Sequence, residues 1–158
     1  MFTDGSEVAE KVAAAAVLSA APNSPFSCQL RDHCSIYTAE LQANLFALKK
    51  AYQSHERKCM ILSDSLSALQ ALRKLKTDHP LLIQIQGLLH KVNADQKGIV
   101  FMWVPGHVGI QGNEAADRAV KEALDDKPTA DLVPFSDLKP FNCQMCIKFG
   151  RKNGIKLV

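Results

Sequence analysis

The stretch between Gly98 and Leu124 constrains the fold most, because it changes from a continuous apolar run to a helical pattern within a few residues. Ile99 to Val104 are six apolar residues in a row, which is typical of a strand covered on both faces of a sheet. Pro105 ends this strand, because proline donates no ladder hydrogen bond. A glycine-rich loop and an alanine-rich segment come next. The sequence therefore predicts a strand, a loop and a helix.

The predicted helix carries an acidic side chain at the edge of its apolar face. Asn113 stands at the expected N-cap, where a side-chain oxygen accepts the first free amides of a helix. At about 100° per residue, Asp117 lies where the apolar arc meets the surface, and Glu114 points to solvent. An aspartate in a first turn often only complements the helix dipole. His107, in the loop before the same helix, favours a functional interpretation.

Three further carboxylates occupy comparable places upstream. Asp4 lies in a short strand that turns after Ser6, and Glu40 lies on the edge of a helix that begins at Thr38. Asp64 directly follows an apolar strand over residues 58–63. Ligands of α/β sheets gather at the carboxyl ends of strands. Asp64 also fits a plain N-cap of the helix that follows it.

The remaining patterns complete an alternation of strands and helices. Residues 12–19 form a second strand or a short helix, since alanine leaves that choice open. Residues 26–30 alternate as a third strand, and residues 81–92 form an amphipathic helix. After Leu124 the sequence contains repeated prolines and many charged residues. We expect an α/β domain over residues 1–125, followed by a linker and a basic tail over residues 126–158.

Composition excludes several classes of protein. The 158 residues suit one domain, and the net charge of +3 would become more basic if bound cations neutralised the carboxylates, which suits a polyanionic partner. Five irregularly spaced cysteines argue for a reducing compartment, and Cys143 and Cys146 lack further zinc ligands. No run approaches the ~20 apolar residues of a membrane span. We expect an intracellular protein, cytoplasmic or nuclear and not secreted, without membrane contact.

Four fragments together resemble the ribonuclease H type 1 family, most closely the RNase H domains of non-LTR (LINE-type) retrotransposon polyproteins. They are FTDGS, YTAELQA, LSDSLSALQAL and WVPGHVGIQGNEAADRAVKEA, and they span roughly residues 1 to 124. The stretch SDLKP around Asp137 is similar to the segment after the domain in those polyproteins. The resemblance implies a three-layer α/β fold. Its five-stranded mixed sheet has antiparallel strands 1 to 3, then parallel strands 4 and 5, and is flanked by helices.

The resemblance also implies endonucleolytic cleavage of the RNA strand of RNA-DNA hybrids by a two-metal-ion mechanism. Asp4, Glu40, Asp64 and Asp117 match the four metal-binding carboxylates of the family, and His107 matches its histidine. Two Mg²⁺ ions, with Mn²⁺ as the alternative, suit hard oxygen ligands and would stabilise the entering and leaving oxygens. His107 would transfer protons near neutrality and help product release.

Substrate selection would rest on 2′-hydroxyl contacts and hybrid shape across a shallow minor groove. The candidates for backbone or sugar contacts are Gly5, Ser6, Ser65 and Asn113. Basic residues that either contact phosphates or form an ordinary solvated surface are Lys49, Lys50, Arg73, Lys74 and Lys76. The expected partners are an RNA-DNA hybrid and an upstream reverse transcriptase domain in a parent polyprotein, with the chain itself monomeric.

The sequence departs from the family in three places. Ile36 and Tyr37 stand where cellular members carry an asparagine pair that contacts substrate. The segment between Leu75 and Leu81 is too short for an extra basic helix. Only Met1 to Thr3 precede Asp4, so we expect a truncated first strand and reduced stability. Two alternatives therefore stay open: a non-catalytic retroelement remnant that binds nucleic acid, and a nuclease of the same fold that cleaves DNA.

Overall fold

The computed structural model describes residues 1–128, 134, 136 and 137, except residue 75. Its strands are β1 (Phe2–Val8), β2 (Lys11–Leu18), β3 (Ala21–Gln29), β4 (Lys58–Ser63) and β5 (Gly98–Trp103). Its helices are α1 (Ile36–Gln53), α2 (Leu66–Leu72), α3 (Pro80–Ala94) and α4 (Gln111–Ala123). The order matches the expected one, although β1 continues through Ser6 where a turn was predicted. The tail beyond residue 137, with Cys143 and Cys146, lies outside the described residues.

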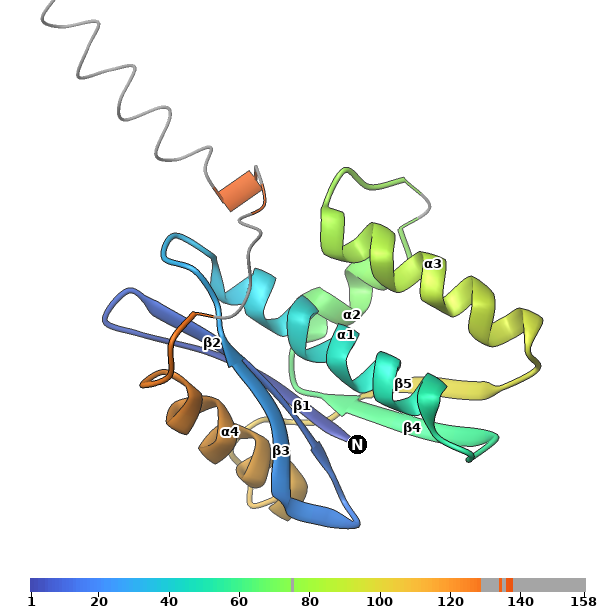
Figure 1. The fold of residues 1–158 in the computed structure, drawn as a ribbon, viewed down its shortest axis with the longest axis horizontal. Coiled ribbons are helices and arrows are strands. Elements are labelled where there is room, and N and C mark those ends of the chain that lie inside the picture. The colour runs from blue at the N-terminus through green and yellow to red at the C-terminus, as the bar shows by residue number, and fades with distance from the viewer. Residues whose placement is uncertain (75, 129–133, 135, 138–158) are drawn as a thin grey trace, which may run out of the picture.

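The strands form one mixed sheet in the order β3-β2-β1-β4-β5. β1, β2 and β3 pair antiparallel, whereas β1 with β4 and β4 with β5 pair parallel. Helices α1, α2 and α3 lie on one face of the sheet, and α4 lies on the other (Figure 1). This arrangement confirms the three-layer α/β fold and places β1, with Asp4, at the centre of the sheet.

The alanine-rich run of β2 shows how packing decides between helix and strand. Ala13 and Ala15 face α4, whereas Ala14 and Ala16 face the α1 side, and all four are fully buried. Small side chains let a helix approach the sheet closely on each face. The segment is therefore a strand covered on both faces, because its tertiary neighbours override the helix preference of alanine.

The prediction that the run ending at Val104 is covered on both faces is wrong. β5 is an edge strand of the sheet. Ile99 and Phe101 pack against the core on the α1 side, but Val100 and Met102 on the other face are 53% and 44% exposed. The reason is that α4 packs on β1, β2 and β3 and leaves this end of the sheet uncovered. A continuous apolar run therefore does not by itself distinguish a central strand from an edge strand.

β1 pairs unequally with its two neighbours. It pairs with β2 along its whole length but with β4 only at Phe2 and Thr3. The carbonyl of Met1 extends this contact by accepting a hydrogen bond from the Leu62 amide at 2.8 Å. No helix in the described part of the chain is long and apolar enough to cross a membrane.

Candidate active site

Three carboxylates meet at the centre of the sheet, and we call them the sheet cluster: Asp4, Glu40 and Asp64. Asp4 lies within β1, Glu40 near the start of α1, and Asp64 directly after β4. One oxygen from each lies within 4.8 Å of the others. Asp4 and Glu40 are only 7% and 8% exposed. Residues that are far apart in sequence therefore place three acidic groups within the reach of one ion.

Two glycines make this convergence possible. A Cβ atom on Gly5 would lie 2.7 Å from the backbone nitrogen of Glu40, so only glycine lets β1 approach α1 so closely. A Cβ atom on Gly106 would lie 2.7 Å from Oδ2 of Asp64. The loop before α4 therefore passes directly against the sheet cluster. We expected Gly5 to contact substrate, but its position supports the packing of Asp4 and Glu40; a substrate contact stays a prediction.

Burial and mutual repulsion make the negative charges of the sheet cluster unfavourable. Burial, followed by the charges of Asp64 and Asp117, raises the pKa of Asp4 to about 7. Burial, followed by the charges of Asp4 and Asp64, raises the pKa of Glu40 to about 9. A hydrogen bond from the Gly5 backbone opposes both shifts. Without an added cation, the cluster therefore retains protons near neutral pH.

An unpartnered oxygen supports a cation at this position. Glu40 Oε2 is buried and has no hydrogen-bond partner among the described residues. Such an atom is costly unless a ligand satisfies it. The sheet cluster offers only hard carboxylate oxygens, which Mg²⁺ and Mn²⁺ prefer over softer donors. The residues present therefore fit a divalent cation.

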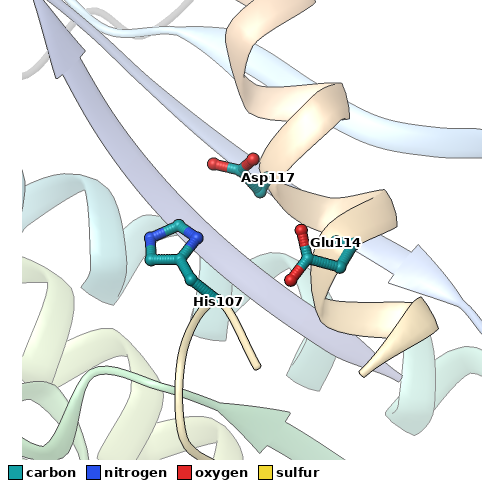
Figure 2. Close-up of side chains that lie close together, drawn as sticks. All are labelled: His107, Glu114 and Asp117. Carbon is teal, nitrogen blue, oxygen red and sulfur yellow. The ribbon is translucent and has the colours of Figure 1, made fainter. Parts of the chain in front are cut away.

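A second group comes from α4 and the loop before it, and we call it the loop cluster: His107, Glu114 and Asp117. One ligand atom from each lies within 4.8 Å of the others. Figure 2 shows His107 on the loop before α4, with Glu114 and Asp117 of α4 pointing toward it. His107 is exposed and has a left-handed backbone, with φ of 55°.

The prediction that Glu114 points to solvent is wrong. Glu114 is partly buried, and its Oε1 accepts a hydrogen bond from the Gly109 amide at 3.4 Å. It therefore contacts the loop that carries His107. The sequence spacing could have indicated this position. Glu114 stands three residues before Asp117, so the two side chains are neighbours on a helix surface.

The two clusters are linked by charge. Asp117 is one cause of the raised pKa of Asp4, and His107 opposes that shift. Lys121 donates a hydrogen bond to Oδ2 of Asp117 at 2.7 Å, and this contact raises the pKa of Lys121. The side chain of Asp117 is 13% exposed, against 57% for Lys121. All four predicted carboxylates therefore act electrostatically on one region beside β1.

Asn113 joins the clusters by a direct contact. Its Nδ2 donates to Oδ2 of Asp64 at 3.1 Å, and the residue is 1% exposed. The prediction that it is the N-cap is wrong, because α4 begins earlier and its N-cap is Ile110, which makes no side-chain cap hydrogen bond. The extra turn of helix directs Asn113 inward. Its Oδ1 is buried and has no hydrogen-bond partner among the described residues.

The other predicted substrate contacts lie near the clusters. Ser6 follows Asp4 by two residues on β1 and is partly exposed, so both side chains face the same side of the sheet. Ser65 caps α2, with its Oγ accepting from the Ala68 amide at 3.4 Å. Among the basic candidates, the Nζ atom of Lys50 lies 4.2 Å from the centroid of the Phe26 ring. Their roles toward a substrate stay predictions.

Comparisons with known proteins agree with this fold. The chain is similar to the Pol polyprotein of Ovine maedi visna related virus (strain South Africa), with 29% identity over 93 residues. That similarity covers 59% of this chain and 9% of the polyprotein, so the chain spans only a small part of its relative. The finer likeness to LINE-type polyproteins stays a prediction. The RNase H family model matches residues 1–125, and the chain therefore belongs to the RNase H family.

Proposed function

We propose that this chain hydrolyses the RNA strand of RNA-DNA hybrids as a metal-dependent endonuclease. The observation that carries the proposal is the sheet cluster: Asp4, Glu40 and Asp64 lie within reach of one ion, and Asp117 adds a fourth charge. Membership of the RNase H family supports a nuclease that acts on hybrids. The two-metal mechanism and the role of each residue are our proposal.

In this proposal the four carboxylates act as ligands. Asp4, within β1, and Asp64, directly after the neighbouring strand β4, hold the shared part of the site. Glu40 and Asp117 complete its outer sides. Bound Mg²⁺ ions, or Mn²⁺ in their place, would supply an activated water and stabilise the leaving 3′ oxygen. The protein contributes a fixed arrangement of ligands, because β1 and α1 are packed into the core.

His107 is proposed to transfer protons and to assist product release. It is exposed and lies within 4.8 Å of Asp117, so it can reach a substrate bound over the clusters. An imidazole ring can both accept and donate a proton, which suits a proton carrier. Glu114 contacts the same loop and would hold it near the reaction.

The substrate is proposed to be recognised by shape and by its 2′-hydroxyl groups. Ser6, Ser65 and Asn113 surround the carboxylates and offer polar groups for backbone or sugar contacts. Since the similar viral protein is a Pol polyprotein, we further propose that this chain works as a monomeric unit inside a cell, joined to an upstream reverse transcriptase domain.

A labelled RNA-DNA hybrid tests the proposal. With Mg²⁺, the wild-type protein should cut the RNA strand at internal positions, and Asp64→Asn should lose this activity. Asp126→Asn, an exposed acidic position after α4, is the matched control and should cut normally. Hybrid binding without any cleavage would instead favour the non-catalytic remnant, and cleavage of duplex DNA would favour a DNA nuclease.

A further inference from the structure

Asp137 lies beyond the residues matched by the family model, yet it contacts the start of α1. Its Oδ2 accepts hydrogen bonds from the Ser35 amide at 2.9 Å and from Thr38 Oγ1 at 2.6 Å. Its Oδ1 accepts from Ser35 Oγ at 3.1 Å. The Asp137 amide donates to the carbonyl of Pro134, which is buried, at 2.9 Å. The segment after α4 therefore returns to the start of α1 and is held there by three donors.

This contact supplies a charge that α1 itself lacks. Ser35 is its N-cap and accepts from the Thr38 amide at 3.2 Å, but the first turn contains no acidic residue. The partial positive charge at the start of a helix is stabilised by a nearby carboxylate. Asp137 provides that carboxylate from the far end of the described chain.

Two further side chains, those of His79 and Tyr37, pack together beside this contact. His79 is 7% exposed, and its Nε2 lies 3.4 Å from Thr38 Oγ1. Burial lowers the pKa of His79, while the charge of Asp137 opposes the shift. The ring of Tyr37 packs edge-on against His79, with centroids 5.7 Å apart. The start of α1 is thus fixed by Asp137 on one side and by His79 on the other.

We propose that Asp137 is a positioning residue for Glu40. Thr38 stands two residues before Glu40 on α1, and Gly5 packs against the Glu40 backbone, so a shift of the first turn would move Glu40 relative to Asp4. This inference rests on the proposed function, in which Glu40 is a cation ligand. It also means that the functional unit extends past residue 125 to at least Asp137.

The expected effect is a weaker cation site in a folded protein. Asp137→Ala removes the three hydrogen bonds from Ser35 and Thr38. Asp137→Asn keeps one acceptor oxygen and loses the charge. We expect Mn²⁺ affinity to fall about 10-fold in Asp137→Ala, the lower end of the loss when a partner behind a ligand is removed. Asp137→Asn should lose less Mn²⁺ affinity than Asp137→Ala.

The experiment uses the full chain and two readouts. Amide hydrogen exchange at Ser35 reports the contact itself, and calorimetric titration with Mn²⁺ reports the consequence for the sheet cluster. Asp126→Asn is the matched control, because it removes one negative charge from the same segment without a side-chain contact to α1 in the structure. It should leave both readouts unchanged.

Faster exchange at Ser35 together with weaker Mn²⁺ binding in Asp137→Ala would support the inference. Unchanged Mn²⁺ affinity would overturn it and leave the proposed function standing. Unchanged exchange at Ser35 would show that the contact does not hold the helix, which also overturns it. A wild-type protein that binds no Mn²⁺ would remove the proposed function as well, so the two failures are distinguishable.

Discussion

The sheet cluster and the loop cluster contain similar groups, but the fold holds them differently. Asp4 and Glu40 come from the central strand and the helix that packs on it, and both are buried. His107 lies on an exposed loop, and its neighbours come from the start of α4. The positions of the buried acids are set by the core, whereas the position of His107 is set by a few local contacts.

In the proposed function, this difference separates two tasks within one site. Buried negative charges that repel one another destabilise the folded protein until a cation binds among them. Because the core fixes their positions, they suit the precise placement of cation ligands. An exposed histidine on a glycine-rich loop can approach and leave a substrate, which suits proton transfer and product release. Substitutions in the sheet cluster should therefore change both stability and activity, and substitutions in the loop cluster mainly activity.

The largest effect is expected at Asp4. Asp4→Asn should lower hybrid cleavage by ~10³-fold or more, since it removes a proposed ligand of the cations that would stabilise the negative charge of the transition state. It should also raise the melting temperature of the metal-free protein at about pH 8, because a buried, repelled charge disappears. Cleavage assays and thermal melts in EDTA measure both. A fall in both quantities would contradict the separation of tasks.

A smaller effect is expected at His107. His107→Ala should slow multiple-turnover cleavage by ~10²-fold, the lower end of the contribution from a positioned proton carrier. The melting temperature should hardly change, since the side chain is exposed. Single-turnover and multiple-turnover rates separate chemistry from product release. A loss as complete as that of Asp4→Asn would erase the distinction between the clusters.

Asn113 tests the contact between the clusters. Asn113→Ala removes the hydrogen bond to Asp64 and should slow cleavage by about 10-fold, as expected for a partner behind a ligand. Asn93→Ala, the same substitution at an exposed position of α3, serves as the control. Equal rates for the two variants would show that α4 does not orient Asp64.

The pH dependence of stability sharpens the comparison further. In the metal-free protein Asp4 and Glu40 have pKa values of about 7 and about 9, above their unfolded values. Unfolding then releases protons, so stability should fall as pH rises from about 4 through 7 toward 9. Thermal melts in EDTA should show a lower melting temperature at about pH 8 than at pH 5. The difference should be about 2–4 °C for each kcal/mol by which the free energy of unfolding falls. A rise over this range would contradict the raised pKa values.

Local patterns in the sequence were sufficient for most of the fold. The bounds predicted for β4 agree with the structure, and the predicted α3 differs by only a few residues at its ends. Such patterns depend on neighbouring residues, so they can be recognised from the sequence alone. The placement of Asp4 on the first strand and of Asp64 directly after a later strand was predictable for the same reason. So was the placement of Glu40 and Asp117 on helices.

The predictions that were wrong concern residues whose neighbours in the structure are distant in the sequence. The exposure of Val100 depends on where α4 packs, and no local pattern encodes that. The inward direction of Asn113 depends on the position of Asp64, and that of Glu114 on the course of the loop. The contact of Asp137 with Ser35 joins segments 102 positions apart. Each error therefore marks a tertiary contact that single-sequence periodicity does not contain.

The central claim is that the sheet cluster holds protons until divalent cations replace them. Calorimetric titration with Mn²⁺ at about pH 7, in two buffers of different ionisation enthalpy, measures this exchange directly. We predict cation binding with net release of protons, and a smaller release in Glu40→Gln, because one of the proton-holding groups is gone. Binding without proton release, or no binding by the wild-type chain, would contradict the account.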